Sequence, residues 1–406
     1  MRPTSILITA TGRDRPGVTA SFFVSLAEHD ADIVDVEQVV VRERLILAVL
    51  IELRGDPWAL RRSVARTAQA LGMDCDVVVE PEDTQRERRS GSGRSHVIVL
   101  GHPLRPGSIS DVAHRIGEVG GTIESVTQLS RLPASSLELL VSSADPVALR
   151  SALVLASDET GLDIAVEPAG LRRRAKRLVV LDFDSTLIQD EGIDALAAAA
   201  GRSREVEAIT YRAMHGELDF ADSLRQRVAL LSGLPYQRVE QVRDGLRLTP
   251  GADRSVRTLR RLGYHVGVVS GGFTVFTDRF VVELGLEFAA ANELDVVDGR
   301  LTGRVLEPIL DSAGKADALR QFAARFSVPI SQTVAVGDGA NDIDMLEQAG
   351  LGIAFNGKAA LRAAADVSVT QPFLDSVLFM LGISGDEIDE VDGMDRPRYA
   401  GLPGTP

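Results

Sequence analysis

The chain has 406 residues, of which 45% are hydrophobic and 25% charged, and its formal net charge is −14. This length allows two or three domains, and the composition is that of an ordinary soluble globular protein. The negative charge argues against nucleic-acid and anionic-membrane partners, because both bind basic surfaces, so any phosphate site must be positive locally.

The single cysteine, Cys75, excludes an intramolecular disulfide framework and is typical of a reducing cytoplasm, where we expect the protein to be located. The N-terminus has no signal-peptide pattern, and no run approaches the roughly 20 apolar residues that span a bilayer. The six histidines form no HExxH motif or other close pair, which argues against a zinc site.

Residues 1–80 predict a first domain in which strands and helices follow the order βαββαβ. The expected elements are a strand at Ile6–Thr11, a helix at Pro16–His29, a hairpin of Ile33–Val41 and Leu45–Leu53, a helix from Asp56-Pro57 to Leu71, and a strand at Cys75–Glu80. The polar, Gly/Ser-rich segment Pro81–Arg94 then indicates a linker.

Residues 95–168 repeat this layout and predict a second domain. Its expected elements are a strand at Val97–Gly101, a helix at Ser108–Val119, a hairpin of Thr122–Leu129 and Leu137–Ser142, a helix opened by Asp145-Pro146, and a strand at Leu162–Glu167. Both segments therefore predict ferredoxin-like domains. Such open sheets have edges that can pair with a second copy, and we expect a homodimer.

Each copy has a Gly/Pro turn after its first strand, Gly12–Gly17 and Gly101–Gly107, that resembles the ligand loop of ACT domains, regulatory modules that often bind amino acids. Backbone N–H groups of such a loop, at a helix N-terminus, suit a ligand carboxylate, and Asp14 could meet the ligand's ammonium. We therefore take Asp14, Gly17 and Gly107 as candidate effector-binding residues. An ordinary turn with Asp14 as a helix cap is the alternative, and the second loop has no matching aspartate.

After the short basic segment Ala169–Lys176, the apolar run Leu178–Leu181 predicts a buried strand, and Asp182 and Asp184 follow it directly. Two carboxylates this close repel each other unless a cation lies between them, and Mg²⁺ prefers such oxygen ligands. One carboxylate can then attack phosphorus and form an aspartyl-phosphate. A Ca²⁺-like loop or a solvated acidic turn is the alternative for this motif alone.

Residues 190–248 predict a small helical cap inserted over this site, whose closure would exclude water. Its helical patterns cover Asp194–Ala200, Glu205–His215, Phe220–Leu231 and Pro235–Arg243.

Three further motifs follow in the remaining α/β segment. The predicted strand Val266–Val269 ends in Ser270-Gly271-Gly272, which offers a hydroxyl and bare N–H groups to a phosphate. Lys315 lies at a predicted helix start, where its ammonium can neutralise phosphate charge. The predicted strand Thr333–Val336 precedes Gly337-Asp338-Gly339-Ala340-Asn341-Asp342, whose carboxylates can complete a Mg²⁺ site. Taken singly, a plain turn, a surface lysine and an Asx-rich turn are the alternatives.

The order DxDST, SGG, Lys and GDGAND resembles that of the haloacid dehalogenase (HAD) superfamily, and within it the phosphoserine phosphatases. The resemblance rests on Asp182–Leu187, Glu191, the cap runs Ala213–Phe220 and Ser223–Val228, Val268–Phe273, Lys315 and Ala335–Asp342. It covers most of residues 177–385. The resemblance implies a Rossmann-like, doubly wound parallel sheet with a helical cap, preceded by two ACT domains and followed by an irregular tail at residues 386–406.

The resemblance also implies a role for each matching residue. Asp182 would be the nucleophile and Asp184 the general acid and base. Mg²⁺ would be held by Asp182, the backbone carbonyl of Asp184, and Asp338, with Asp342 close by. The phosphoryl group would be bound by Ser270, Gly271, Lys315 and Asn341. Glu191 would meet the ammonium of the substrate and Arg227 its carboxylate, while Met214 and Phe220 would pack the pocket.

The leading hypothesis is thus a Mg²⁺-dependent phosphatase that converts O-phospho-L-serine to L-serine, the last step of serine biosynthesis, with ACT domains that sense an amino acid such as L-serine. Alternatives are a HAD phosphatase for another small phosphomonoester or for a phosphoprotein, and an amino-acid-binding regulator with a degenerate phosphatase body. The intact set of Asp182, Asp184, Lys315 and Asp338 argues against the last of these.

Overall fold

The computed structural model describes residues 3–79, 93–170 and 175–392, with the side chains of Met214 and of residues 390–392 outside this description. The chain divides into two compact units, residues 1–92 and 93–406. Most of the predicted linker Pro81–Arg94 and half of the short basic segment Ala169–Lys176 lie outside the described residues. None of the helices in the described ranges is both long and apolar enough to cross a membrane.

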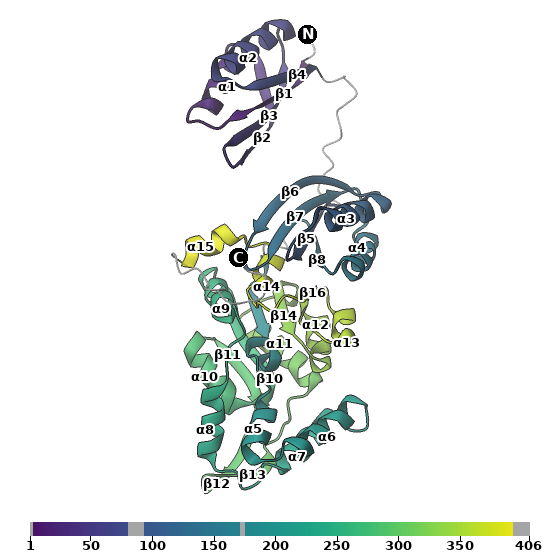
Figure 1. The fold of residues 1–406 in the computed structure, drawn as a ribbon, viewed down its shortest axis with the longest axis vertical. Coiled ribbons are helices and arrows are strands. Elements are labelled where there is room, and N and C mark those ends of the chain that lie inside the picture. The colour runs from purple at the N-terminus through teal and green to yellow at the C-terminus, as the bar shows by residue number, and fades with distance from the viewer. Residues whose placement is uncertain (1–2, 80–92, 171–174, 393–406) are drawn as a thin grey trace. The chain divides into compact units, whose positions relative to one another are not determined.

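The first unit is a four-stranded antiparallel sheet in the order β2-β3-β1-β4, with both helices on one face (Figure 1). Its elements are β1 (Thr4–Arg13), α1 (Val18–Ala27), β2 (Ala31–Val41), β3 (Arg44–Leu53), α2 (Pro57–Leu71) and β4 (Asp74–Val79). Helix α2 begins where the sequence indicates, because Asp56 accepts the N–H of Trp58 and Pro57 occupies the first turn. The predicted βαββαβ order is confirmed.

The second unit begins with the same topology, in the strand order β6-β7-β5-β8. The elements are β5 (Ser95–Gly101), α3 (Pro106–Glu118), β6 (Thr122–Ser130), β7 (Ser135–Ser142), α4 (Pro146–Thr160) and β8 (Asp163–Pro168). Asp145 caps α4 by accepting the N–H groups of Val147 and Ala148. The predicted repeat of the layout is confirmed here as well.

A six-stranded parallel sheet in the order β11-β10-β9-β14-β15-β16 forms the centre of the second unit. Its strands are β9 (Leu178–Leu181), β10 (His265–Phe273), β11 (Phe288–Asn292), β14 (Thr333–Gly337), β15 (Gly352–Phe355) and β16 (Val367–Val369). Strand β9 lies between β10 and β14, so the chain order reverses beside it. In open α/β sheets a ligand binds at the carboxyl ends of the strands at this reversal.

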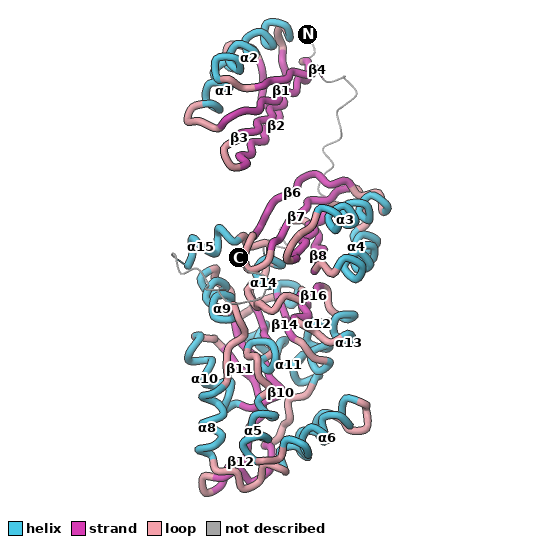
Figure 2. The backbone as a smooth tube through the Cα atoms, viewed as in Figure 1, coloured by secondary structure: helices cyan, strands magenta, loops and turns pink. Residues whose placement is uncertain are grey.

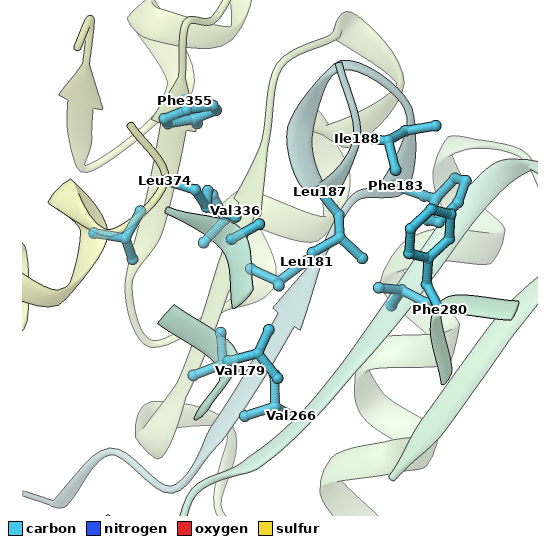
Figure 3. Close-up of a cluster of buried hydrophobic side chains, with 14 of the residues drawn as sticks. Val179, Leu181, Phe183, Leu187, Ile188, Val266, Phe280, Val336, Phe355 and Leu374 are labelled. Atoms are coloured by element: carbon cyan, nitrogen blue, oxygen red, sulfur yellow. The ribbon is translucent and has the colours of Figure 1, made fainter. Parts of the chain in front are cut away.

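Helices cover both faces of the parallel sheet: α9 (Ala252–Arg261), α10 (Thr274–Leu284), α11 (Ser312–Arg325), α12 (Ile343–Gln348), α13 (Ala359–Ala364) and α14 (Ser376–Met380). Successive strand residues therefore enter two separate cores, with Val179 and Leu181 in one and Leu178 and Val180 in the other. This burial explains the uninterrupted apolar run. Figure 3 shows the first core, where the ring of Phe183 contacts that of Phe280 edge-on with centroids 5.5 Å apart.

The cap contains the four predicted helices and one hairpin that the sequence analysis did not predict (Figure 2). Its elements are α5 (Gly192–Ala200), α6 (Ser203–Met214), α7 (Phe220–Ala229), α8 (Tyr236–Gly245), β12 (Leu294–Val297) and β13 (Arg300–Val305). Backbone hydrogen bonds join the hairpin to the segment after α7: Gly233 donates to Leu301, and Leu301 donates to Leu234. The cap thus draws on two stretches of sequence.

The second ferredoxin-like domain packs directly on the parallel-sheet domain. Ile98, Leu100 and Ala165 belong to the same buried cluster as Leu181. The buried carboxylate of Asp163 on β8 accepts the N–H of Thr370, just after β16, at 2.9 Å. These two domains therefore share a buried hydrophobic interface, while the other face of the second domain's sheet has its own core, which includes Val97, Val112 and Leu149.

The expectation of an irregular tail from residue 386 is wrong for its first seven residues, because α15 spans Gly385–Asp392. Ile388 is fully buried, and Asp389 accepts a hydrogen bond from Arg254 of α9 at 2.5 Å. The apolar contact and the ion pair stabilise a helix whose composition is otherwise acidic. Residues 393–406 lie outside the described range.

Candidate active site

A cavity of about 650 Å³ lies where the cap meets the carboxyl ends of the parallel strands. Its lining combines the acidic turns after β9 and β14, the glycines at the end of β10 and one side of the cap. The lining residues named by the sequence analysis are Asp182, Asp184, Glu191, Phe220, Arg227, Gly271, Asp338 and Asn341. Side chains that are far apart in sequence thus converge on one chamber.

The floor of the cavity holds a buried ion triad of Asp182, Lys315 and Asp342. The Lys315 ammonium donates to Asp182 Oδ1 at 2.5 Å and to Asp342 Oδ1 at 2.7 Å. Burial and the nearby Asp342 raise the pKa of Asp182, while Lys315 opposes this rise. A buried lysine paired with two carboxylates stays charged, because their attraction outweighs its loss of hydration. Lys315 is therefore a fixed cation beneath the cavity.

The turn after β14 is shaped by Asp342. Its Oδ2 accepts the backbone N–H groups of Asp338 at 3.2 Å and of Gly339 at 3.0 Å. A Cβ at Gly337 would lie 2.5 Å from the Asp342 side chain, so only glycine fits there. Asp342 does not line the cavity itself but fixes the backbone that presents Asp338 and Asn341 to it.

Asp182, Asp338 and Asp342 each place one carboxylate oxygen within 4.8 Å of the others. Burial and the Asp342 charge raise the pKa of Asp338 to about 6, against the opposing charges of Lys358 and Lys315. Converging carboxylates of this kind fit a hard divalent cation such as Mg²⁺, which takes oxygen ligands. The sequence analysis named Asp182 and Asp338 as ligands and expected Asp342 nearby.

Both carboxylate oxygens of Asp184 accept hydrogen bonds. Gly192 N–H donates to Oδ1 at 2.8 Å, and the Ser270 hydroxyl donates to Oδ2 at 3.0 Å. Burial raises the pKa of Asp184, and these two bonds oppose the rise. A carboxyl group that is buried, oriented and inclined to hold a proton has the properties of a general acid.

Glu191 and Arg227 lie on the cap side of the same cavity. Glu191 accepts the hydroxyl of Ser185 at 2.8 Å, and burial together with Asp184 raises its pKa to about 7. Arg227 donates through Nε to the carbonyl of Ser223 at 3.3 Å, and burial lowers its pKa. Phe220 approaches Gly271 so closely that a Cβ on the glycine would lie 2.8 Å from the ring. The Met214 side chain lies outside the described atoms.

Five further polar residues line the cavity that the sequence analysis did not name as site residues: Asp194, Thr210, Ser223, Ser312 and Lys358. Asp194 lies one turn beyond Glu191 on α5, and its charge acts on Arg227. Lys358 follows β15, and its N–H donates to the Asp338 carbonyl at 3.0 Å. The position of Lys358 after another parallel strand is the sequence signal that would have indicated it as a site residue.

The candidate effector residues lie in both units. Gly17 is the N-cap of α1 with φ 90°, a conformation that favours glycine, and no side chain caps this helix. Asp14 is exposed, and its N–H donates to the Glu43 carbonyl at 2.8 Å. Asp14 is therefore not a helix cap. Gly107 lies in the first turn of α3, which begins at Pro106, two residues before the predicted start.

Comparisons with known proteins agree with this geometry. Residues 176–350 match the haloacid dehalogenase-like hydrolase family, and residues 4–78 and 94–167 each match an ACT domain family. The chain is 51% identical to a phosphoserine phosphatase of Streptomyces coelicolor over 96% of this chain and 94% of that one. It is 50% identical to phosphoserine phosphatase SerB2 of Mycobacterium tuberculosis over 96% of each chain.

A solved structure is also similar to this chain in its fold. The crystal structure of a probable phosphoserine phosphatase from Vibrio cholerae, in unliganded form, superposes with a TM-score of 0.57 at 35% identity. The superposition covers 73% of this chain and 88% of the other.

Proposed function

The chain belongs to the phosphoserine phosphatases of the haloacid dehalogenase-like hydrolase family, in the form that carries two ACT domains, and we propose that it hydrolyses O-phospho-L-serine to L-serine and phosphate. The observation that carries the proposal is the cavity itself. One end has the Asp182–Lys315 pair and the acidic turn. The cap side has the base Arg227 together with the acids Glu191 and Asp194.

In this mechanism an Asp182 carboxylate oxygen attacks phosphorus, and the bond from phosphorus to the serine oxygen breaks. Asp184 gives its proton to the departing oxygen, and L-serine leaves. Asp184, now a carboxylate, takes a proton from water as the water attacks the aspartyl-phosphate, which regenerates Asp182 and frees phosphate. The fixed ammonium of Lys315 and the N–H groups at the end of β10 stabilise the charge that develops on the phosphoryl oxygens.

We further propose that Mg²⁺ is held by Asp182, Asp338 and the carbonyl of Asp184, with Asp342 nearby. When bound, the cation neutralises the nucleophile and the phosphoryl oxygens, so that two anions can approach each other. The rest of the phosphoryl contact is assigned to Ser270, Gly271 and Asn341.

Substrate selection is assigned to the cap. The Glu191 carboxylate meets the ammonium of the substrate, which favours its ionised form, and the Arg227 guanidinium holds the substrate carboxylate through paired hydrogen bonds. Phe220, packed against Gly271, closes the side of the chamber and excludes water.

A phosphate-release assay tests this function. O-phospho-L-serine is compared with O-phospho-L-threonine, phosphoglycolate and a phosphoserine peptide, each with Mg²⁺ and with excess chelator. We expect phosphoserine to have the highest kcat/KM and chelation to remove the activity. A clear preference for phosphoglycolate or the peptide would contradict the proposed substrate.

We propose that residues 1–80 and 95–168 serve as regulatory ACT domains for a phosphatase at residues 177–385, with L-serine as the effector at the Asp14 loop. Asp14→Ala is then expected to weaken the response to added L-serine, whereas Asp30→Ala, an exposed aspartate before β2, leaves it unchanged. If both variants responded to L-serine equally, the effector site would have to lie elsewhere in the chain.

The homodimer is proposed to form through an edge of the ACT sheets. Strand β2 is an exposed edge strand that pairs only with β3 in the first unit. Light scattering of the purified chain should give a mass near twice 43.5 kDa.

A further inference from the structure

Asn292 is a buried polar residue next to the cavity that the mechanism above does not use. It is the last residue of β11, and its side chain is 2% exposed. Its Nδ2 donates to the Gly271 carbonyl at 2.9 Å and to the Leu310 carbonyl at 3.5 Å, and its Oδ1 accepts the Leu310 N–H at 2.7 Å. The amide therefore joins the irregular last part of β10 to the segment that precedes α11.

The chemistry of the partners fixes the orientation of this amide. A backbone N–H can only donate and a carbonyl can only accept, so the oxygen of Asn292 must face Leu310 N–H and the nitrogen must face Gly271. Aspartate has the same shape but no donor. At this position its carboxylate would still accept the Leu310 N–H but would repel the Gly271 carbonyl.

The Gly271–Gly272 peptide is held at both ends. Asn292 donates to the Gly271 carbonyl, and the Gly272 N–H donates to the Ser270 hydroxyl oxygen at 2.8 Å. Because the peptide is planar, fixing the carbonyl also fixes the direction of the N–H.

The direction of the Ser270 hydroxyl follows from this bond. With the Gly272 N–H on its oxygen, the hydroxyl proton is left to point at Asp184 Oδ2, 3.0 Å away. A continuous series of hydrogen bonds thus runs from Asn292 to the carboxyl group of Asp184.

The other side of Asn292 faces the helix that carries Lys315. Leu310 immediately precedes Asp311, which caps α11 by accepting the N–H of Gly314 at 2.8 Å. The same amide therefore fixes the Gly271–Gly272 peptide relative to the start of α11.

From this arrangement we propose that Asn292 is a positioning residue for the phosphatase reaction. It orients the Gly271–Gly272 peptide so that the Ser270 hydroxyl holds Asp184 in place to protonate the leaving oxygen. The inference rests on the proposed function, and its tests separate the two.

The first test compares Asn292→Asp with wild type on two substrates. The alkoxide of O-phospho-L-serine needs a proton to leave, whereas the phenolate of p-nitrophenyl phosphate does not. We expect kcat/KM for phosphoserine to fall at least about tenfold more than kcat/KM for p-nitrophenyl phosphate, since a general acid contributes about 10²- to 10⁴-fold. Equal losses on the two substrates would overturn the proposal.

A double-mutant cycle identifies the route of the effect. If Asn292 acts through Ser270, then Asn292→Asp should cost little further kcat/KM in a Ser270→Ala background, because the hydroxyl it orients is gone. Independent, multiplying losses would contradict the series of hydrogen bonds. Leu286→Ala is the matched control: it removes a buried contact just before β11 and should lower Tm without changing the ratio between the two substrates.

A third readout does not depend on turnover. Amide exchange of residues 270–273, followed by mass spectrometry, should be faster in Asn292→Asp than in wild type and Leu286→Ala, and unchanged exchange would refute the inference. If Asn292→Asp does not fold, Asn292→Ser provides the same comparisons with a smaller donor. A wild type that hydrolyses p-nitrophenyl phosphate but not phosphoserine would instead overturn the proposed substrate, and the leaving-group comparison would then use another alkyl phosphate from the panel.

Discussion

At the scale of single residues, Lys315 sets the electrostatics of the site. A protein with a net charge of −14 does not attract a phosphate dianion at long range. One fully buried ammonium under the cavity supplies positive charge locally, and its two carboxylate partners keep it ionised. Solvent does not screen this charge, because Lys315 is fully buried.

Replacing Asp182 with asparagine tests the nucleophile. We expect kcat to fall by at least about 10⁴-fold, since an amide cannot form the acyl phosphate and loss of a nucleophile removes most of the catalysis. The fold should persist, because Lys315 keeps its 2.7 Å contact with Asp342. Phosphate release gives the activity and circular dichroism the fold; turnover above background would contradict the assignment.

Arg227→Ala tests the cap residue that is proposed to hold the substrate carboxylate. Removing one partner of a buried charge pair costs about 2 to 5 kcal/mol, so kcat/KM for phosphoserine should fall by roughly 30- to 5,000-fold. Phosphoethanolamine, which lacks the carboxylate, should lose much less. Arg225→Ala is the control, because Arg225 pairs with Glu307 on the exposed side of α7. Equal losses of kcat/KM on both substrates would show that Arg227 has a structural role instead.

At the scale of elements, the contact between β8 and β16 makes the second ACT domain part of the catalytic unit. Burial raises the pKa of Asp163 from 3.8 to about 6, and the hydrogen bonds from Thr370 oppose the rise. A carboxyl group whose pKa is higher in the folded state favours folding while it is protonated. Stability is therefore lost as the pH rises from about 3.8 to about 6.

Asp163→Asn should remove this pH dependence. At pH 7.5 the variant should resist urea better than wild type by about 1 to 3 kcal/mol, because one pKa unit corresponds to about 1.4 kcal/mol. Near pH 4 the two proteins should be equally stable. Urea unfolding at both pH values measures the difference, and a variant that is less stable at pH 7.5 would show that the ionised carboxylate is needed at this junction.

The cap hairpin shows how elements can escape sequence analysis. Strands β12 and β13 are short, and their exposed valines give only a weak pattern. Backbone hydrogen bonds to the loop after α7 stabilise them instead. Similarly, the acidic segment at the start of the tail forms α15 because Ile388 and Asp389 find partners in distant parts of the chain. Neither set of contacts can be predicted from the local amino-acid composition.

At the scale of the whole molecule, the chain has two units with separate cores. The core of the first unit includes Leu60 and Val64. The second ACT domain has its own core between its sheet and helices, and the other face of its sheet also packs in the main cluster of the catalytic domain. The two ACT domains are thus alike in sequence layout and different in how they are integrated. We expect the units to unfold independently.

Leu60→Ala tests this separation. Because Leu60 is fully buried, its truncation should lower the free energy of unfolding of the first unit by about 2 to 5 kcal/mol. The melting temperature of that unit should then fall by roughly 10 °C or more. The midpoint of thermal inactivation should not change, whereas Leu196→Ala, buried in the second unit, should lower it. Scanning calorimetry and residual activity give both values; a single transition that moves with either substitution would mean that the units unfold together.

The sequence alone determined the order of elements in the two ACT domains, the helices of the cap and the proposed catalytic set. Those features depend on local rules: apolar runs mark the parallel strands, Asp-Pro pairs start helices α2 and α4, and carboxylates directly after strands indicate a phosphate and metal site. Asp182, Lys315 and Asp338 could therefore be named before their geometry was known.

Only the tertiary structure decided which polar groups act on one another. It placed Asp342 beneath the cavity as a partner of Lys315, brought Lys358 and Asp194 to its wall, and connected Asn292 to Asp184 through a peptide and a hydroxyl. The physical reason is that hydrogen bonds and ion pairs depend on distances of a few ångströms between segments far apart in sequence. Those distances exist only once the sheet, the cap and the second ACT domain have packed together.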